Sequence, residues 1–167
     1  DLTGWRKPIS HYRNIVWDRG EKLYLAVQAP TADGRPWQPT QWALPPTLDS
    51  WTWPGQEGKP LTVEVYSRHD RVRLFLDGQL LGEQPTTRAE QFKAVFTVPY
   101  APGVLKAVGV TAGREVESCV LETAGQPVGV RLRPDYVDKA LDQSWPTFLV
   151  AEIIDAALAL FNRKGFA

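Results

Sequence analysis

The sequence lacks several features that would indicate a particular class of protein. A single cysteine, Cys119, excludes an internal disulfide. No apolar run approaches the roughly 20 residues that a membrane-spanning helix needs. Lysine plus arginine and aspartate plus glutamate both number 19, so zero net charge gives no electrostatic case for a nucleic-acid or anionic-membrane partner. No basic segment followed by an apolar one opens the chain, and we therefore expect no signal peptide.

Methionine is absent altogether, so Asp1 is not a natural start, and we expect the chain to be a piece of something longer. Its 167 residues are 43% apolar and 23% charged. That length and composition allow a real core in one domain, or in one domain plus fragments of others.

The stretch 61–110 organises the rest of the chain. Val63 and Val65 alternate with polar or aromatic residues, and Val72, Leu74 and Leu76 do the same further on. A period of two is typical of strands that bury one face.

Asp77-Gly78 lies between two of these apolar runs and predicts a tight hairpin, because a type I′ turn needs positive φ at both central residues. A two-residue loop would pair Phe75 with Leu80 and Leu74 with Leu81. We therefore expect Leu74 and Leu81 in the core, and Phe75 with Leu80 as an apolar pair on the opposite face.

Before and after this stretch, turn residues separate further short elements. Residues 8–17 have helical spacing, with an apolar stripe that needs a partner. We expect this helix to pack poorly in this chain, or else to be covered by a neighbouring molecule or laid over the sandwich. Strands are expected at 22–28, 79–83, 92–98, 104–110 and 114–122. The sequence predicts an all-β fold, an immunoglobulin-like antiparallel β-sandwich with a short N-terminal helix and an incomplete C-terminal segment.

After a linker at 124–127, an alternating run begins at Val128 and indicates the start of a new structural unit. Residues 147–155 fit a strand, whereas the overlapping run from Ile154 to Phe161 fits a helix, and periodicity alone leaves both open. About forty residues are too few for an independent domain.

Several segments, each weak alone, form a specific combination. They are DLTGWRKP at 1–8, HYR at 11–13, VW at 16–17, WTW at 51–53, VEVYS at 63–67, VRLFLDG at 72–78, VPYAPG at 98–103 and LETAG at 121–125. In this combination the chain resembles the C-terminal part of family-2 glycoside hydrolases of the β-galactosidase type.

The resemblance implies three parts. Residues 1–20 would be the last loop and helix of a catalytic (β/α)8 barrel, 21–126 an immunoglobulin-like sandwich, and 127–167 the incomplete start of a following β-domain. It also implies a parent chain that hydrolyses β-glycosidic bonds, with a periplasmic or extracellular bacterial location slightly favoured.

The chain itself carries no recognisable catalytic set. Retaining glycosidases need two carboxylates about 5 Å apart, and the resemblance places both upstream of Asp1. We expect Glu57, Glu64, Asp70 and Asp77 at turns or on solvent faces. His11 and His69 are isolated, and neither a metal site nor a cofactor is expected.

Exposed aromatic and apolar side chains are the only binding candidates. Indole rings can stack on sugars or anchor interfaces, and an outward apolar pair indicates an interface. The candidates for carbohydrate or interdomain contact are Trp37, Trp42, Trp51, Trp53, Phe75 and Leu80.

Three functions remain open from the sequence. The first is a non-catalytic accessory sandwich packed against the catalytic barrel of the same parent chain. The second is a stand-alone carbohydrate-binding module, and the third an immunoglobulin-like protein-interaction domain. The helix at 8–17 favours the first, because an autonomous module would not carry it.

Overall fold

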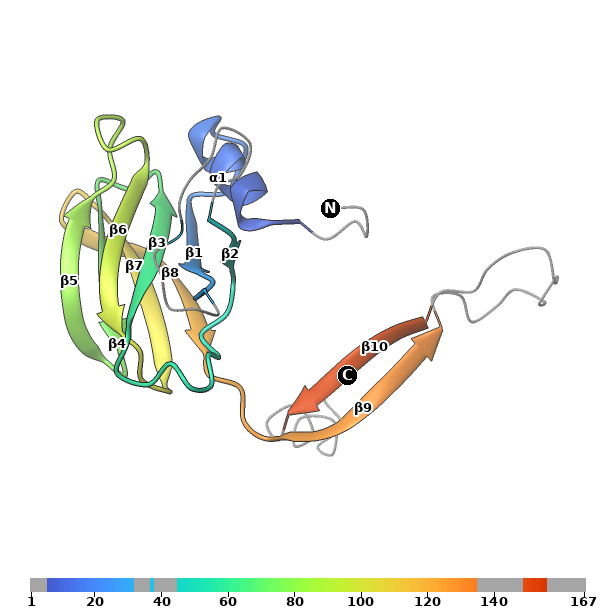
Figure 1. Cartoon of the computed structure of the whole chain (residues 1–167). Helices are drawn as coiled ribbons and strands as arrows, with labels where there is room; N and C mark the ends of the chain where they lie inside the picture. Colours follow the sequence, from blue (N-terminus) through green and yellow to red (C-terminus); the bar gives the residue numbers. More distant parts are fainter. Residues whose placement is uncertain (1–5, 32–36, 38–44, 135–148, 156–167) are drawn as a thin grey trace, which may run out of the picture. The chain divides into compact units, whose positions relative to one another are not determined.

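The computed structural model describes residues 6–31, 37, 45–134 and 149–155. The chain divides into two compact units, Asp1–Thr123 and Ala124–Ala167 (Figure 1). No helix within the described residues has the length and apolar character needed to cross a membrane.

The first unit is an antiparallel β-sandwich preceded by one helix, α1 (Pro8–Val16). Its strands are β1 (Leu23–Gln28), β2 (Thr47–Leu48), β3 (Pro60–Ser67), β4 (Arg71–Leu76), β5 (Gln79–Pro85), β6 (Lys93–Pro99), β7 (Val104–Thr111) and β8 (Arg114–Glu122). One sheet has the order β2-β1-β3-β6 and the other the order β5-β4-β7-β8. This division of sequential strands between two sheets is that of an immunoglobulin-like fold, so the predicted fold class is confirmed.

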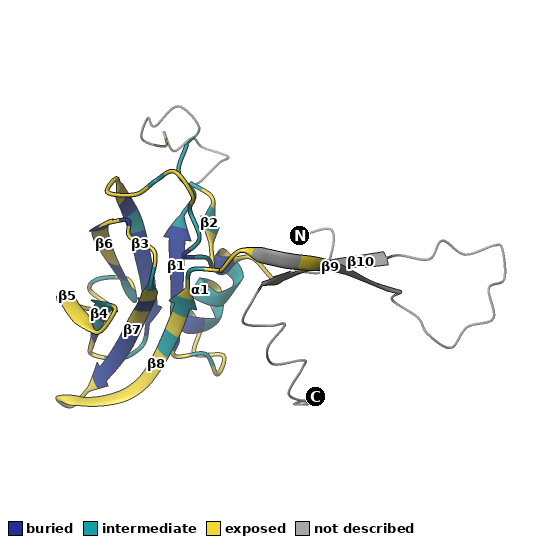
Figure 2. Cartoon of the chain, turned by 90° about the horizontal axis from the view of Figure 1, so that it is seen from below, coloured by how far each residue is buried: buried dark blue, intermediate teal, exposed yellow. Residues whose placement is uncertain are grey.

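The core lies between the two sheets and takes alternate residues from β1, β3, β4, β6 and β7 (Figure 2). Four of the residues predicted to share it are fully buried: Val63, Val65, Val72 and Leu74. Leu76, the fifth, packs against the core but is only partly buried.

The hairpin between β4 and β5 turns where the sequence predicts, but its register changes one step later. Asp77 and Gly78 both have positive φ, at 49° and 80°, and Phe75 pairs with Leu80 as expected. A bulge then places Leu74 opposite Gly82. Leu81 is therefore 40% exposed, and its predicted place in the core was wrong.

Helix α1 lies on the outer face of the first sheet, against β1 and β3 (Figure 1). Pro8 occupies its first turn, where the missing N–H costs nothing. Ile15 is completely buried and forms a second, smaller core with Ala26 and Tyr66. The helix therefore does not pack poorly on the side that faces the sheet; of the expected arrangements, it adopts the one in which it is laid over the sandwich.

The second unit contains an antiparallel pair, β9 (Pro127–Pro134) and β10 (Leu149–Asp155). The alternation that begins at Val128 thus belongs to a strand. Residues 149–155 are also a strand, which settles the ambiguity of that segment, while the competing helical run continues into residues 156–161, outside the described part.

Candidate functional site

A buried carboxylate lies beneath α1, on the outer face of the first sheet. Glu64 is only 5% exposed, and it is surrounded by donors from three strands. The Tyr66 hydroxyl donates to Oε2 at 2.7 Å and the Gln28 amide to Oε1 at 2.8 Å. The Lys93 ammonium completes the set at 2.8 Å from Oε2.

These donors decide the charge of the group. Burial works to raise the pKa of Glu64, but the hydrogen bonds from Lys93, Gln28 and Tyr66 hold that pKa below its usual range. Burial, together with the hydrogen bond to Glu64, raises the pKa of Tyr66 in turn. An ionised, fully paired carboxylate of this kind holds strands together, and it is enclosed away from any substrate.

The prediction of a solvent-facing Glu64 was therefore wrong. Sequence alternation correctly placed it on the face opposite Val63 and Val65, but that face is covered. The missed signal was α1 itself, since its apolar stripe had to cover some surface, and the outer face of the neighbouring sheet was available.

The other three carboxylates have the turn chemistry that the sequence predicts. Glu57 accepts the Gly55 N–H at 3.2 Å, and Asp70 accepts the Ala112 N–H at 2.8 Å. Asp77 accepts the Val104 N–H at 2.8 Å and so ties the β4–β5 turn to β7. Each holds a loop in place.

Side chains from the sandwich fix the middle and the C-terminal end of α1. The Tyr12 ring packs on Tyr66 with centroids 4.9 Å apart. At the C-terminal end, the Arg68 guanidinium donates to the carbonyls of Ile15 and Val16, both at 2.9 Å, which satisfies acceptors that the helix leaves open.

His11 is not isolated, contrary to expectation. Its Nδ1 lies 2.5 Å from Glu21 Oε1, and its ring stacks on Tyr24 with centroids 4.1 Å apart. Arg6 also pairs with Glu21, at 3.1 Å. Burial and the nearby charges of Asp49 and Glu21 raise the pKa of Tyr24 to about 12. The cluster links the start of α1 to β1.

His69 is also in contact with its surroundings. It lies in the turn between β3 and β4. Its ring nitrogens lie 3.0 Å from Thr111 Oγ1 and 3.0 Å from Glu117 Oε2, so the ring joins this turn to β7 and β8.

The candidate tryptophans do not form one binding surface. Trp51 is completely buried in the core, with its indole N–H donated to the Ala101 carbonyl at 3.0 Å, so it cannot stack on a sugar. Trp53 packs at the edge of the same core, and its indole donates to the Ser50 carbonyl. Trp37 is exposed, and Trp42 lies outside the described residues.

Phe75 and Leu80 do lie side by side on the outer face of the second sheet. They are direct cross-strand partners in β4 and β5. Leu80 is 52% exposed and Phe75 is half-buried. The predicted outward pair is thus present, and a contact made by it stays a prediction.

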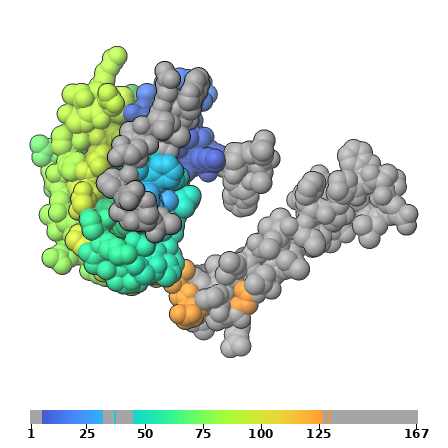
Figure 3. Space-filling view, viewed as in Figure 1, coloured from blue at the N-terminus to red at the C-terminus, as the bar shows by residue number. Residues whose placement is uncertain are grey.

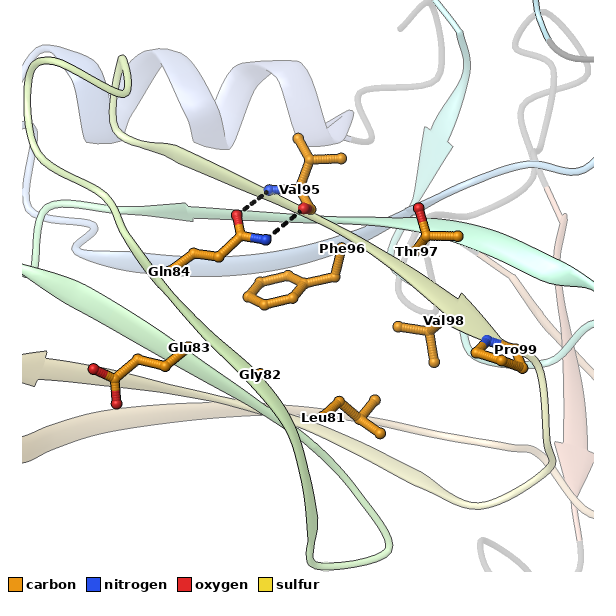
Figure 4. A pocket seen from close by; sticks show the side chains of 9 residues that line it. All are labelled: Leu81, Gly82, Glu83, Gln84, Val95, Phe96, Thr97, Val98 and Pro99. Atoms are coloured by element: carbon orange, nitrogen blue, oxygen red, sulfur yellow. Dashed lines mark hydrogen bonds between the residues drawn. The ribbon is translucent and has the colours of Figure 1, made fainter.

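A groove of about 400 Å³ runs between the free edges of β5 and β6 (Figure 4). Apolar side chains of Leu81, Phe96 and Val98 line it. The Gln84 amide crosses it, donating to the Val95 carbonyl at 2.8 Å and accepting the Val95 N–H at 3.3 Å. Strands around it form one flank of the first unit, yellow-green in Figure 3.

This groove is poorly suited to pairing with an added strand. Gln84 already occupies the outward N–H and carbonyl of Val95, and Pro99 has no N–H to offer. Within the described residues, no group of three or more histidine, cysteine, aspartate or glutamate side chains is arranged to hold a metal ion.

Comparison with known proteins identifies the sandwich. A family model described as a domain of unknown function, DUF4982, matches residues 58–117. A putative β-glucuronidase of Formosa agariphila is 38% identical over 129 residues, covering 76% of this chain and 10% of that protein. The β-galactosidase BoGH2A of Bacteroides ovatus is 29% identical over 159 residues, covering 93% of this chain and 15% of that protein.

Solved structures agree with the sequence relatives. A glycosyl hydrolase family 2 member from Bacteroides cellulosilyticus has a TM-score of 0.75 at 34% identity, over 94% of this chain and 21% of that one. A second structure of a member from the same organism has a TM-score of 0.77 at 35% identity. The chain spans 10–15% of the length of the curated relatives it matches. It belongs to glycoside hydrolase family 2, of whose members it matches only a small part.

Proposed function

We propose that this chain is a non-catalytic accessory β-sandwich region of a β-galactosidase-like glycosidase, packed against the catalytic barrel of the same parent chain. The parent hydrolyses β-glycosidic bonds. In this proposal residues 1–20 are the last loop and helix of the barrel, 21–126 form the sandwich, and 127–167 begin the next β-domain.

The observation that carries the proposal is the two-sided character of α1. One side is fixed to the sandwich, where Ile15 is completely buried. The other side keeps large apolar groups outside, because Ile9 is 49% exposed and Trp17 is 59% exposed. Helix α1 and the Trp17 that caps it thus present apolar groups on the side away from the sandwich as well, which suits a position between two bodies.

The exposed side has the composition of an interface anchor. The guanidinium groups of Arg13 and Arg19 lie 5.7 and 5.2 Å from the Trp17 ring centroid. Tryptophan and arginine are the residues most enriched at the centre of protein interfaces. The relatives, named as a β-glucuronidase and a β-galactosidase, supply the activity expected of the parent.

The described carboxylates support a structural contribution. Glycoside hydrolysis needs an acid with a raised pKa and a second carboxylate across the same bond. Glu64 has a lowered pKa and is enclosed, and Glu57, Asp70 and Asp77 hold turns. We expect the isolated chain to leave aryl β-glycosides intact, whereas the full-length parent cleaves them with retention.

The test removes the outer apolar side of α1 by the double substitution Ile9→Ser and Trp17→Ser. Losing two buried apolar groups should cost the full-length parent about 2–5 kcal/mol of stability. The isolated chain should change by less than about 1 kcal/mol, since both side chains are exposed there.

Thermal inactivation of glycosidase activity in the parent and urea unfolding of the isolated chain provide the two readouts. Val116→Ser is the matched control, because Val116 is 54% exposed but lies on β8. If the double substitution destabilised the isolated chain as much as the parent, or did not destabilise the parent, α1 would be excluded as the contact with the barrel.

A further inference from the structure

The outer face of the second sheet carries an apolar row that crosses all four strands. Leu80, Phe75, Lys106 and Val120 are successive cross-strand partners in β5, β4, β7 and β8. Direct partners point to the same face of a sheet. Because Leu74, Leu105 and Ala107 point into the core, this row points outward.

Val104 lies two residues before Lys106 in β7 and so shares its face. We call Leu80, Phe75, Lys106, Val120 and Val104 the outer patch. Leu80 and Val120 are 52% and 50% exposed, while Phe75 is half-buried and Lys106 is exposed. Contiguous apolar groups of this size on one face indicate a contact surface.

The other half of the same face is covered by the chain's own ion pairs. Arg73 pairs with Glu83 at 2.6 Å and with Glu115 at 3.0 Å, and Arg71 pairs with Glu83 at 2.9 Å. Beneath them, Val108 and Val110 face outward from β7 and yet are buried. The same sheet thus covers its outward valines at one end and leaves them bare at the other.

The uncovered end also differs from the ion-paired end in charge, because Lys106, the charged side chain of the outer patch, is unpaired among the described residues. This lysine lies in the middle of the apolar row and forms no ion pair with any residue that the structure describes. A surface that covered the row would remove water from this ammonium group, and a carboxylate would be needed opposite it.

We propose that the outer patch docks another domain of the parent chain, through an apolar surface that carries a carboxylate facing Lys106. The identity of the occupant is inferred from the length of the relatives and from the charge of Lys106, which is unpaired within the described part of the chain. The relatives are several times longer than this chain, so most of the parent lies outside it. This contact is separate from the one proposed for α1, which lies on the other sheet.

Two other occupants fit the patch less well. A sugar stacks on a flat exposed ring, whereas the only ring here is half-buried and its neighbours are aliphatic. A second copy related by a two-fold axis through the patch would bring two Lys106 side chains together. Both occupants are outcomes of the test.

The test measures burial of the patch in the full-length parent. In a Cys119→Ser background, Leu80→Cys places a thiol in the patch, and Val116→Cys places one on β8 outside the row. The two positions are 52% and 54% exposed in this structure. Each labelling rate is divided by the rate of the same thiol in the isolated chain, which corrects for the carboxylates of Glu115 and Glu117 on either side of position 116. We expect a maleimide to react with the thiol at 80 at least about tenfold more slowly.

Val120→Cys, also in the patch, provides a second probe should the variant at 80 fail to fold. Equal labelling at 80 and 116 would overturn the proposal. Protection that disappears on dilution would identify a second copy instead. Protection that appears only when galacto- or gluco-oligosaccharides are added would identify a sugar, and either result also overturns it.

Reversing the charge of residue 106 tests whether a carboxylate of the partner domain faces it. Lys106→Glu should accelerate labelling of the thiol at 80 by about tenfold or more, because it sets two carboxylates against each other, while Lys106→Arg should preserve protection. Protection unaffected by Lys106→Glu would rule out the facing carboxylate. The α1 contact can fail its own test while the thiol at 80 stays protected, so the two proposals are distinguishable.

Discussion

Replacing Lys93 by methionine tests whether the network around Glu64 stabilises the fold. The change keeps most of the side-chain length and removes the ammonium that lies 2.8 Å from Glu64 Oε2. Hydrogen bonds to charged groups contribute about 1.5–3 kcal/mol each, and a fully buried pair can cost 3–5 kcal/mol when one partner is lost. Because Lys93 remains 33% exposed, water can partly replace it, and we expect a loss of about 1.5–3 kcal/mol at neutral pH.

The dependence on pH gives the sharper criterion. In the native protein the pKa of Glu64 is lowered, so its stabilising contribution is present above the unfolded pKa of about 4.3 and is lost as pH falls through the folded value. Without Lys93, burial prevails and the pKa of Glu64 rises, so the charged form becomes destabilising. The deficit of the variant should therefore be largest near neutral pH. It should shrink as the pH falls, first through the raised pKa of Glu64 in the variant and then through the lowered pKa of Glu64 in the native protein.

Urea unfolding followed by tryptophan fluorescence, to which the buried Trp51 contributes, measures both effects. Lys59→Met is the control, because Lys59 is exposed and its ammonium, among the residues that the structure describes, bonds only to the Gly55 carbonyl, at 3.1 Å. A deficit below about 0.5 kcal/mol, or one that is the same at about pH 7 and pH 4, would refute this account of the network.

Two further predictions concern the core and the thiol. Leu74→Ala should lower the free energy of unfolding by about 2–5 kcal/mol because Leu74 is completely buried, whereas Leu81→Ala should cost less than about 1 kcal/mol; similar losses in urea titrations would contradict the bulged register. Burial, with the charge of Glu117 nearby, raises the pKa of Cys119 to about 12. The folded protein should therefore react with an aromatic disulfide reagent far more slowly than the urea-unfolded protein, and comparable rates would count against a half-buried, protonated thiol.

Local signals in the sequence predicted the hairpin, and one of them also pointed to its irregularity. Asp77-Gly78 fixed the turn and the pairing of Phe75 with Leu80. The bulge was missed because two adjacent leucines, at 80 and 81, allow either one to face the core. Gly82 was the available sign, since a glycine within a strand often accompanies a bulge or a close approach. A Cβ placed there would lie 3.4 Å from the Phe96 ring.

Long-range contacts were beyond the same analysis. Alternation assigned Glu64 to the outer face correctly, but its charge state depends on Gln28 and Lys93, which lie on other strands. The contacts of His11 likewise join residues that are ten or more positions apart. Periodicity reports which face a side chain takes and carries no information on what covers that face.

The tryptophans show why side-chain type alone does not locate a contact surface. The WTW segment at 51–53 resembles a binding cluster, yet Trp51 is enclosed by the core and meets the Tyr100 ring edge-on at 5.1 Å. The Tyr100 hydroxyl accepts the Trp53 N–H at 3.1 Å, so these rings join the segment before β3 to the β6–β7 corner. Trp17, which the sequence treats only as an extension of the helical stripe, is instead 59% exposed between two arginines. A large indole left in water at the end of a helix that is otherwise fixed to the sheet is better accounted for by a neighbouring body than by the sandwich. Trp17 is therefore the ring on which the proposed contact with the barrel would depend.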